Sequence, residues 1–149
     1  SRTENFPAVI LRLFLVFGPG QSDNRFLPQI IQGCLSGDNF PTSKGEQLRD
    51  FCYVDDVSNG ILKTLTNDSV NGEVINLASG RPLAIREVIE MVQKNINLGI
   101  PNFGEIPYRK GENMFLYADV SKSRKLLNWF PKVSIEDGIL RTIQSFINS

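Results

Sequence analysis

"PAVILRLFLVFGPG", residues 7–20, contains a run from Val9 to Phe17 that is apolar at every position except Arg12. Because polar and apolar residues do not alternate, the run is typical of a parallel β-strand covered on both faces. Gly18-Pro19-Gly20 then ends the strand. We therefore expect one strand over 9–17 in the middle of a parallel sheet. Only a few residues precede it, so we interpret the chain as the second half of a larger fold.

Strands and helices alternate along the remaining sequence. Asp55 or Asp56 is expected to cap the helix 57–65, because a carboxylate accepts hydrogen bonds from the free amides of a first turn. Ser134, with Asp137 three residues later, forms a variant of the capping box. The expected helices are 26–35, 57–65, 85–96, 121–129 and 134–147, and the other expected strands are 49–54, 72–79 and 105–109, with 39–43 as a connection. This order predicts an α/β fold without a second domain in residues 1–149.

The composition is that of an ordinary soluble domain. Sixteen basic residues balance sixteen acidic ones, and the pI is about 6.2. A nucleic-acid-binding protein normally carries a basic excess, so we expect no nucleic-acid partner. No apolar run approaches the ~20 residues of a membrane span, and the opening residues SRTENFPAV show no signal-peptide pattern. We therefore expect a cytoplasmic protein that is not inserted in a membrane.

The chain lacks the residues that several common catalytic mechanisms require. It contains no histidine, which excludes Ser-His and Cys-His nucleophile pairs and most zinc sites. Cys34 and Cys52 have no metal-ligand spacing, so we expect two buried thiols and no metal. Gly18-Pro19-Gly20 lacks the third glycine of a G-x-G-x-x-G loop, and no tyrosine is followed four positions later by lysine. The chain by itself shows no catalytic machinery.

Two arginines are the better candidates for a binding site. Arg49 leads into the strand 49–54, and Arg109 ends the expected strand 105–109. Guanidinium groups bind phosphate oxygens in a bidentate manner, so arginines at two strand ends could clamp a diphosphate. From the residues alone, surface or ion-paired arginines remain the other interpretation. We interpret the basic cluster at 122–125 as the solvated face of a helix and Trp129 as a core residue.

Six segments give the chain a family resemblance over about residues 8–147. They are, in order, ILRLFLVFGPGQ, RFLPQII, KGEQLRDFCYVDDV, GEVINLASGRPLAIREVI, YRKGE and YADVSKSRKLLNWFPKVSIEDGI. Together they resemble the C-terminal half of the NAD-dependent epimerase/dehydratase family, the extended short-chain dehydrogenases that act on nucleotide sugars. The resemblance implies the C-terminal part of a Rossmann-type parallel sheet, interleaved with a small α/β substrate-binding domain. The N-terminal NAD-binding half would then be absent from residues 1–149.

The resemblance also assigns roles to individual residues. Arg49 occupies the position of the diphosphate-binding arginine in the family's R-D-F-x-Y-V-D-D motif. Arg109 matches a second diphosphate-binding arginine, in an R-x-G-D/E turn whose acidic position is Glu112. The remaining expected site residues are Arg25 and Phe26 in the base pocket, Phe40 and Thr42 over the nucleoside, and Phe14 near the nicotinamide.

The implied activity is that of an NAD(P)-dependent epimerase, dehydratase or 4-ketoreductase, with a nucleoside-diphosphate sugar as substrate. NAD or NADP would be bound mainly by the absent half, and a homodimer of the full-length protein is left open. Residues 1–149 alone, without the glycine-rich loop and Tyr-x-x-x-Lys, are expected to be inactive. Leu15 departs from the family, which commonly has asparagine there, and Phe17 replaces a tyrosine. The alternative is a non-catalytic nucleotide-binding or protein-interaction module that begins near Ser1.

Overall fold

The computed structural model describes residues 7–148. Its fold is α/β, as the sequence predicts, and most of its strand pairs are parallel. The elements in chain order are β1 (Ile10–Leu13), β2 (Leu15–Phe17), α1 (Phe26–Leu35), β3 (Asn39–Thr42), β4 (Leu48–Tyr53), α2 (Val54–Leu65), the 3-10 helix η1 (Asp68–Val70), β5 (Val74–Leu77), β6 (Pro82–Ala84), α3 (Ile85–Ile96), β7 (Ile100–Phe103), β8 (Phe115–Leu116), α4 (Ser121–Leu127) and α5 (Ile135–Ile147).

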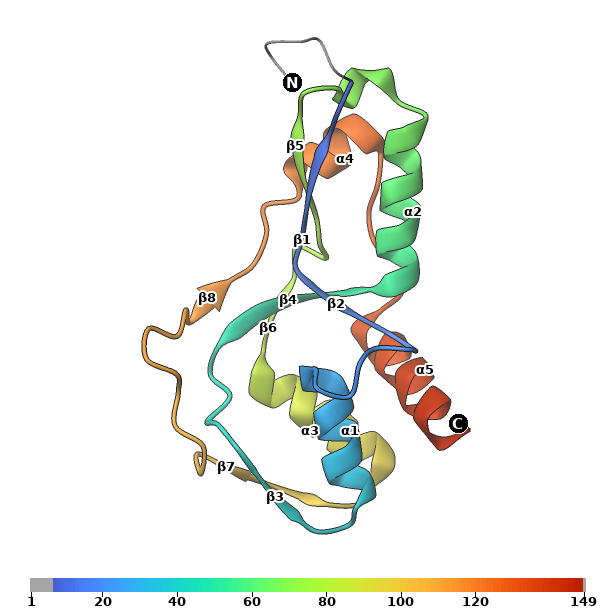
Figure 1. Ribbon diagram of the computed structural model, residues 1–149. Coiled ribbons are helices and arrows are strands. Elements are labelled where there is room, and N and C mark those ends of the chain that lie inside the picture. Colours follow the sequence, from blue (N-terminus) through green and yellow to red (C-terminus); the bar gives the residue numbers. More distant parts are fainter. Residues whose placement is uncertain (1–6, 149) are drawn as a thin grey trace.

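Figure 1 shows an upper and a lower part, with the strands β2 and β4 crossing between them. In the upper part, β1 pairs with β5 in parallel beside α2 and α4. In the lower part lie α1, α3 and α5, and the parallel pair β3–β7 closes the far end. β4 pairs in parallel with β2 and β8 and antiparallel with β6. This strand therefore links both parts, and it carries Arg49 near its start.

The prediction of one continuous strand over 9–17, covered on both faces, is wrong in two respects. The run is interrupted at Phe14, because the chain leaves its pairing with β5 there and pairs with β4 instead. Its apolar side chains are also not all covered, since Ile10 is 60% and Leu13 is 48% exposed. Among the described residues, β1 pairs with β5 alone. Its other edge therefore presents backbone groups that no described strand satisfies.

The expected capping of α2 by Asp55 or Asp56 is also wrong. The helix begins earlier than expected, at Val54, and its N-terminus has no side-chain cap. Asp56 is instead buried in the first turn, where its carboxylate accepts hydrogen bonds from the backbone amides of Lys132 (3.0 Å) and Val133 (2.9 Å). These donors lie far along the chain, so the local sequence around Asp56 could not reveal them.

The predicted strand 105–109 is absent, and a strand lies just before it, at β7. β7 pairs with β3, which covers the stretch that the sequence suggested was a connection. After β7, the backbone amides of Gly104 and Ile106 both donate to the carbonyl oxygen of Thr42 at 3.0 Å. Because two donors that are two residues apart converge on one acceptor, the chain turns at this point and does not continue as a strand.

The helices predicted from apolar spacing are confirmed, although α4 ends at Leu127, two residues earlier than expected. Ser134 caps α5 as predicted, with its Oγ accepting a hydrogen bond from the Asp137 amide at 3.1 Å. The apolar faces of α1, α3 and α5 form the lower core with side chains of β2 and β4. A second core lies between the β1–β5 pair, α2 and α4, and it includes Trp129, which is buried as predicted.

Both cysteines are buried and unpaired with one another, as the sequence predicts. Burial raises the pKa of the Cys34 thiol from 9.0 to about 11. For Cys52, burial and then the charges of Asp56 and Asp50 raise the pKa to about 12. Above pH 9.0 the unfolded state therefore binds fewer protons than the folded state, so these thiols make the protein less stable as the pH rises.

We expect a thiol reagent to label neither cysteine of the folded protein near neutral pH and to label both after unfolding. The reason is that only the thiolate reacts readily, and burial suppresses it. The free energy of unfolding should fall between pH 9 and 11. This fall should be smaller in a variant with alanine at positions 34 and 52 than in the wild type. Fast labelling of either thiol in the folded protein would contradict this account.

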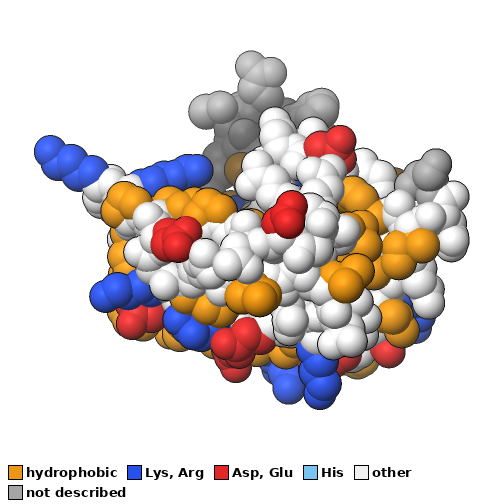
Figure 2. Space-filling model, turned by 90° about the horizontal axis from the view of Figure 1, so that it is seen from below, with side chains coloured by type: hydrophobic (Ala, Val, Ile, Leu, Met, Phe, Trp, Pro, Cys, Tyr) orange, Lys and Arg blue, Asp and Glu red, His pale blue; other side chains and the backbone are white. Residues whose placement is uncertain are grey.

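The surface agrees with the balanced charge of the sequence. Figure 2 shows Lys and Arg side chains interspersed with Asp and Glu side chains on the lower end of the molecule. On α4, Lys122 pairs with Glu73 at 2.7 Å, and Arg124 and Lys125 are exposed, as predicted for a solvated helix face. Within residues 7–148, none of the helices combines the length and the apolar character that a membrane span requires.

Candidate functional site

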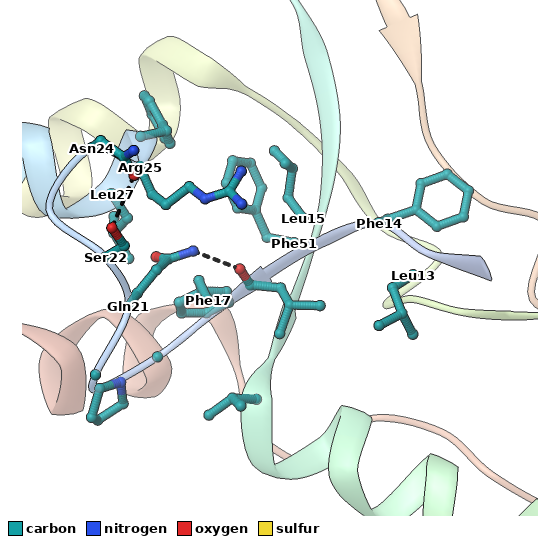
Figure 3. A pocket seen from close by; sticks show the side chains of 16 residues that line it. Leu13, Phe14, Leu15, Phe17, Gln21, Ser22, Asn24, Arg25, Leu27 and Phe51 are labelled. Carbon is teal, nitrogen blue, oxygen red and sulfur yellow. Dashed lines mark hydrogen bonds between the residues drawn. The ribbon is translucent and has the colours of Figure 1, made fainter. Parts of the chain in front are cut away.

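A groove of about 720 Å³ opens at the carboxyl end of β2. It is lined by residues 13–22 and 24–27, together with Phe51 and Val54. The Gly18-Pro19-Gly20 turn leads the chain out of β2 and along the rim of the groove. Here the Gln21 Nε2 donates to the carbonyl oxygen of Val16 at 2.9 Å (Figure 3). In an α/β sheet, the crevice at the carboxyl ends of parallel strands is the usual place for a ligand.

Three of the sequence-predicted site residues line this groove. Arg25 is exposed at the start of α1, and its guanidinium extends into the space between Gln21 and Leu15 in the view of Figure 3. Phe26 is half-buried and lies against Phe51, with 6.0 Å between ring centroids. Phe14 lines the opposite end of the groove from Arg25. The groove therefore has apolar, aromatic walls and a cationic side chain at one end.

Arg49 and Arg109 do not line this groove. Arg49 forms an ion pair with Glu112, and Arg109 lies in the same turn as Glu112. The Arg49 Nη2 donates to the Glu112 Oε1 at 2.5 Å, and its Nη1 donates to the carbonyl oxygen of Leu48 at 2.9 Å. Arg109 precedes Glu112 in a turn, closed by a hydrogen bond of 3.0 Å from the Glu112 amide to the Arg109 carbonyl oxygen. Gly111 in this turn has φ 77°, a left-handed conformation that glycine adopts without strain.

Arg49 and the groove share one face of β4. Successive side chains of a strand point to opposite faces, so Arg49 and Phe51 lie on the same side, about 7 Å apart along the strand. Phe51 forms a wall of the groove. A ligand with an apolar ring system in the groove could therefore extend along β4 and place an anionic group at Arg49.

Asp50, the residue after Arg49, has a structural role that the sequence did not suggest. Asp50 is fully buried on the other face of β4. Its Oδ1 accepts hydrogen bonds from the Ser79 amide (2.7 Å) and hydroxyl (2.6 Å), and its Oδ2 accepts them from the amides of Gly80 (2.8 Å) and Ala118 (3.4 Å). Asp50 thus ties β4 to two distant loops and holds the strand segment that carries Arg49.

Phe40 and Thr42 lie on β3, apart from the groove. The Thr42 hydroxyl shares its one proton between the carbonyl oxygens of Ser43 (3.1 Å) and Asn102 (3.4 Å), and the second of these lies on β7, the strand that pairs with β3. The ring of Phe40 packs on Gly33, where a Cβ atom would lie 2.9 Å from the ring. The structure therefore does not bring Phe40 and Thr42 together with Arg25, Phe26 and Phe14.

Three polar residues on the groove rim were not among the sequence predictions. They are Gln21, Ser22 and Asn24. Ser22 Oγ donates to the Asn24 Oδ1 at 3.0 Å, so this part of the rim is held by its own hydrogen bonds (Figure 3). The Gly-Pro-Gly turn before them, at the end of a strand, is the signal from which these residues could have been found.

Comparison with known proteins gives consistent results. The sequence profile of the NAD dependent epimerase/dehydratase family matches residues 1–78. The UDP-glucuronate 4-epimerase of Thermodesulfobacterium geofontis is 34% identical over 142 residues, which cover 90% of this chain and 41% of that protein. The CDP-abequose synthase of Salmonella typhimurium is 33% identical over 138 residues, covering 88% and 46%. The chain thus spans less than half the length of these relatives.

Solved structures match the whole fold. The UDP-glucuronic acid 4-epimerase from Bacillus cereus, solved in complex with UDP-glucuronic acid and NAD, is 31% identical, with a TM-score of 0.87 over 99% of this chain and 47% of that one. The epimerase Mth375 from Methanothermobacter thermautotrophicus has a TM-score of 0.90 at 26% identity, over 99% and 45%. The α/β fold is therefore the one expected from the resemblance. The chain belongs to the NAD-dependent epimerase/dehydratase family.

Proposed function

We propose that this chain is the nucleotide-sugar-binding portion of an NAD(P)-dependent epimerase, dehydratase or 4-ketoreductase. One observation carries the proposal: Arg49 lies on the same face of β4 as an aromatic groove and already binds a carboxylate. The family membership and the UDP-glucuronic acid and NAD in a 31% identical structure support it. This portion binds the nucleoside diphosphate and orients the sugar.

Each predicted residue takes a part in this proposal. Arg49 and Arg109 hold the diphosphate, because guanidinium forks bind phosphate oxygens through charge-assisted hydrogen bonds. Arg25 and Phe26 contact the base in the groove, and Phe14 at its other end lies near the nicotinamide. Phe40 and Thr42 belong to the segment over the nucleoside. Thr42 contributes mainly by holding β3 in place, since its one hydroxyl proton is already directed at backbone carbonyl oxygens.

Residues 1–149 form the C-terminal half of the proposed enzyme, and the half that binds NAD or NADP lies on the open edge of β1. The edge of β1 that no described strand pairs and the exposed side chains of Ile10 and Leu13 support this arrangement. A further parallel strand would pair with that edge, and the crossover helices of a parallel sheet would cover the exposed side chains. A bound nicotinamide supplies hydride transfer at a sugar carbon, while a tyrosine of the other half acts as general acid and base. Without that half, these residues bind substrate and catalyse nothing.

The test is titration of the protein with UDP-, CDP-, GDP- and dTDP-sugars. Replacing Arg49 by alanine should weaken binding of the preferred nucleotide sugar about 50-fold, because a hydrogen bond to a charged group contributes about 1.5–3 kcal/mol. Replacing Arg124, an exposed arginine on α4, should change the dissociation constant less than about twofold. Calorimetry measures both variants.

Two outcomes would contradict the proposal. Equal affinity of wild type and the Arg49→Ala variant would remove the diphosphate role of Arg49. Absence of binding to all four nucleotide classes would favour the non-catalytic interaction module. Which nucleotide class is bound follows from the titration itself.

A further inference from the structure

A second cavity, of about 280 Å³, lies beside β4. Three segments that are far apart in the sequence line it: the end of β4, the loop between β5 and β6, and residues 131–136, which lead into α5. Only Phe17 and Phe51, two of the groove residues in Figure 3, line both the groove and the second cavity. The second cavity therefore offers a place for a ligand that is distinct from the groove, with the two cavities meeting at these rings.

The aromatic wall of the second cavity is closely packed. Phe17 lies edge-to-face with Phe51 and Tyr53, at centroid distances of 6.3 and 5.6 Å, and all three rings are buried. The helix α5 approaches two of them so closely that a Cβ atom at Gly138 would lie 2.7 Å from the Phe17 Cζ and 2.9 Å from the Tyr53 Cδ2. Because the rings are already fixed by these contacts, an apolar ligand would bind this wall without first having to order it.

Three charged side chains complete the lining of the second cavity. They are Arg81, Lys132 and Glu136, and all three are exposed. None of the ion pairs within residues 7–148 involves them. Two positive charges and one negative charge leave a net charge of +1. A ligand with a single negative charge therefore matches this lining, whereas Glu136 disfavours a ligand that carries several.

We propose that the second cavity binds a small carboxylate with an aromatic body. The ligand ring packs against Phe17 and Phe51, because aromatic rings attract one another in edge-to-face and offset contacts. Its carboxylate is bound by Arg81 and Lys132, since a guanidinium matches the two oxygens of a carboxylate. Pockets for drug-sized ligands measure roughly 300–1,000 Å³, so this slightly smaller cavity suits a molecule with one ring. The site does not use Arg49 and does not depend on the proposed function.

Benzoate is the probe, added to the isotope-labelled protein while the backbone amide resonances are followed by NMR. We expect saturable shifts at the amides of Arg81, Leu83 and Val133, which line the second cavity. Benzamide has the same ring without the charge and should bind about fivefold more weakly, since the cations are exposed. Acetate has the charge without the ring and should bind at least about tenfold more weakly, because it buries little apolar surface.

The double variant Arg81→Gln/Lys132→Gln tests the two cations. It should bind benzoate about fivefold more weakly than the wild type, with an affinity close to that of benzamide. The matched control is Arg124→Gln/Lys125→Gln, which removes one exposed arginine and one exposed lysine of α4 that do not line the second cavity. Its affinity for benzoate should change less than about twofold. Thermal unfolding establishes that both variants are folded.

Four outcomes would overturn the proposal: no saturable binding of benzoate, equal affinity for benzamide, equal losses in the two double variants, or shifts at Phe14 and Arg25 of the groove in place of those at the second cavity. Competition is a further check, since saturating UDP should not displace benzoate from a distinct site. Displacement would place benzoate in the groove and contradict the proposal. A protein that binds benzoate at residues 131–136 but none of the four nucleotide sugars would contradict the proposed function alone.

Discussion

Replacing Asp50 by alanine is expected to lower the free energy of unfolding by about 4 kcal/mol. The carboxylate is fully buried and accepts four hydrogen bonds from Ser79, Gly80 and Ala118. Alanine would leave three backbone amides without an acceptor in a place that water does not reach. A buried donor left unsatisfied costs about 1–3 kcal/mol, so even partial relaxation leaves a large loss.

Chemical denaturation of wild type and variant measures this loss. Asp23→Ala is the matched control, because Asp23 is an exposed aspartate in the loop before α1, and it should change stability by less than about 0.5 kcal/mol. Asp50→Asn should also be strongly destabilising, since the amide places N–H groups where one oxygen now accepts. A loss below about 1 kcal/mol for Asp50→Ala would mean that the three loop amides find other acceptors.

Replacing Trp129 by alanine should cost a similar amount, about 3–5 kcal/mol, as is usual for large aromatic side chains in a core. Trp129 is 2% exposed in the upper core, and its Nε1 donates to the carbonyl oxygen of Asp56 at 3.1 Å. Its ring also lies against Gly60, where an added Cβ would come within 3.1 Å of Cε2. The variant would lose buried area, a hydrogen bond and the contact between the chain after α4 and the helix α2.

The neighbouring residue provides the control. Phe130 has a similar size and is 53% exposed, so Phe130→Ala should change the free energy of unfolding by less than about 0.5 kcal/mol. Both variants are compared by chemical denaturation under the same conditions. Equal losses for the two would show that burial of Trp129 does not support the upper core.

Elements with a local signal were predicted well from the sequence. The helices α1 and α3 follow from apolar residues at helical spacing, and the start of α5 follows from Ser134 and Asp137. Elements that depend on a partner far away in the sequence were not predicted correctly. β3 became a strand because β7 lies beside it, and the run 9–17 is interrupted where its partner changes from β5 to β4.

The candidate site divides in the same way. Arg49 and Arg109 could be singled out from the sequence because arginine is seldom buried. An arginine next to a predicted strand therefore suggests a polar or anionic partner. Nothing in the spacing indicated that Glu112, 63 positions after Arg49, would occupy its guanidinium. Nor did it indicate that Asp50 would accept bonds from loops 29 to 68 positions away.

By itself, the sequence determined the α/β class, the helices and the family, because periodicity, capping residues and motifs are properties of neighbouring residues. Tertiary structure alone decided which strands pair, which aspartates are structural and which acid neutralises Arg49. The physical reason is that hydrogen bonds and ion pairs act over a few ångströms in space, whatever the separation along the chain. Asp50 and Arg49 are adjacent in sequence, yet they point to opposite faces of β4 and meet entirely different partners.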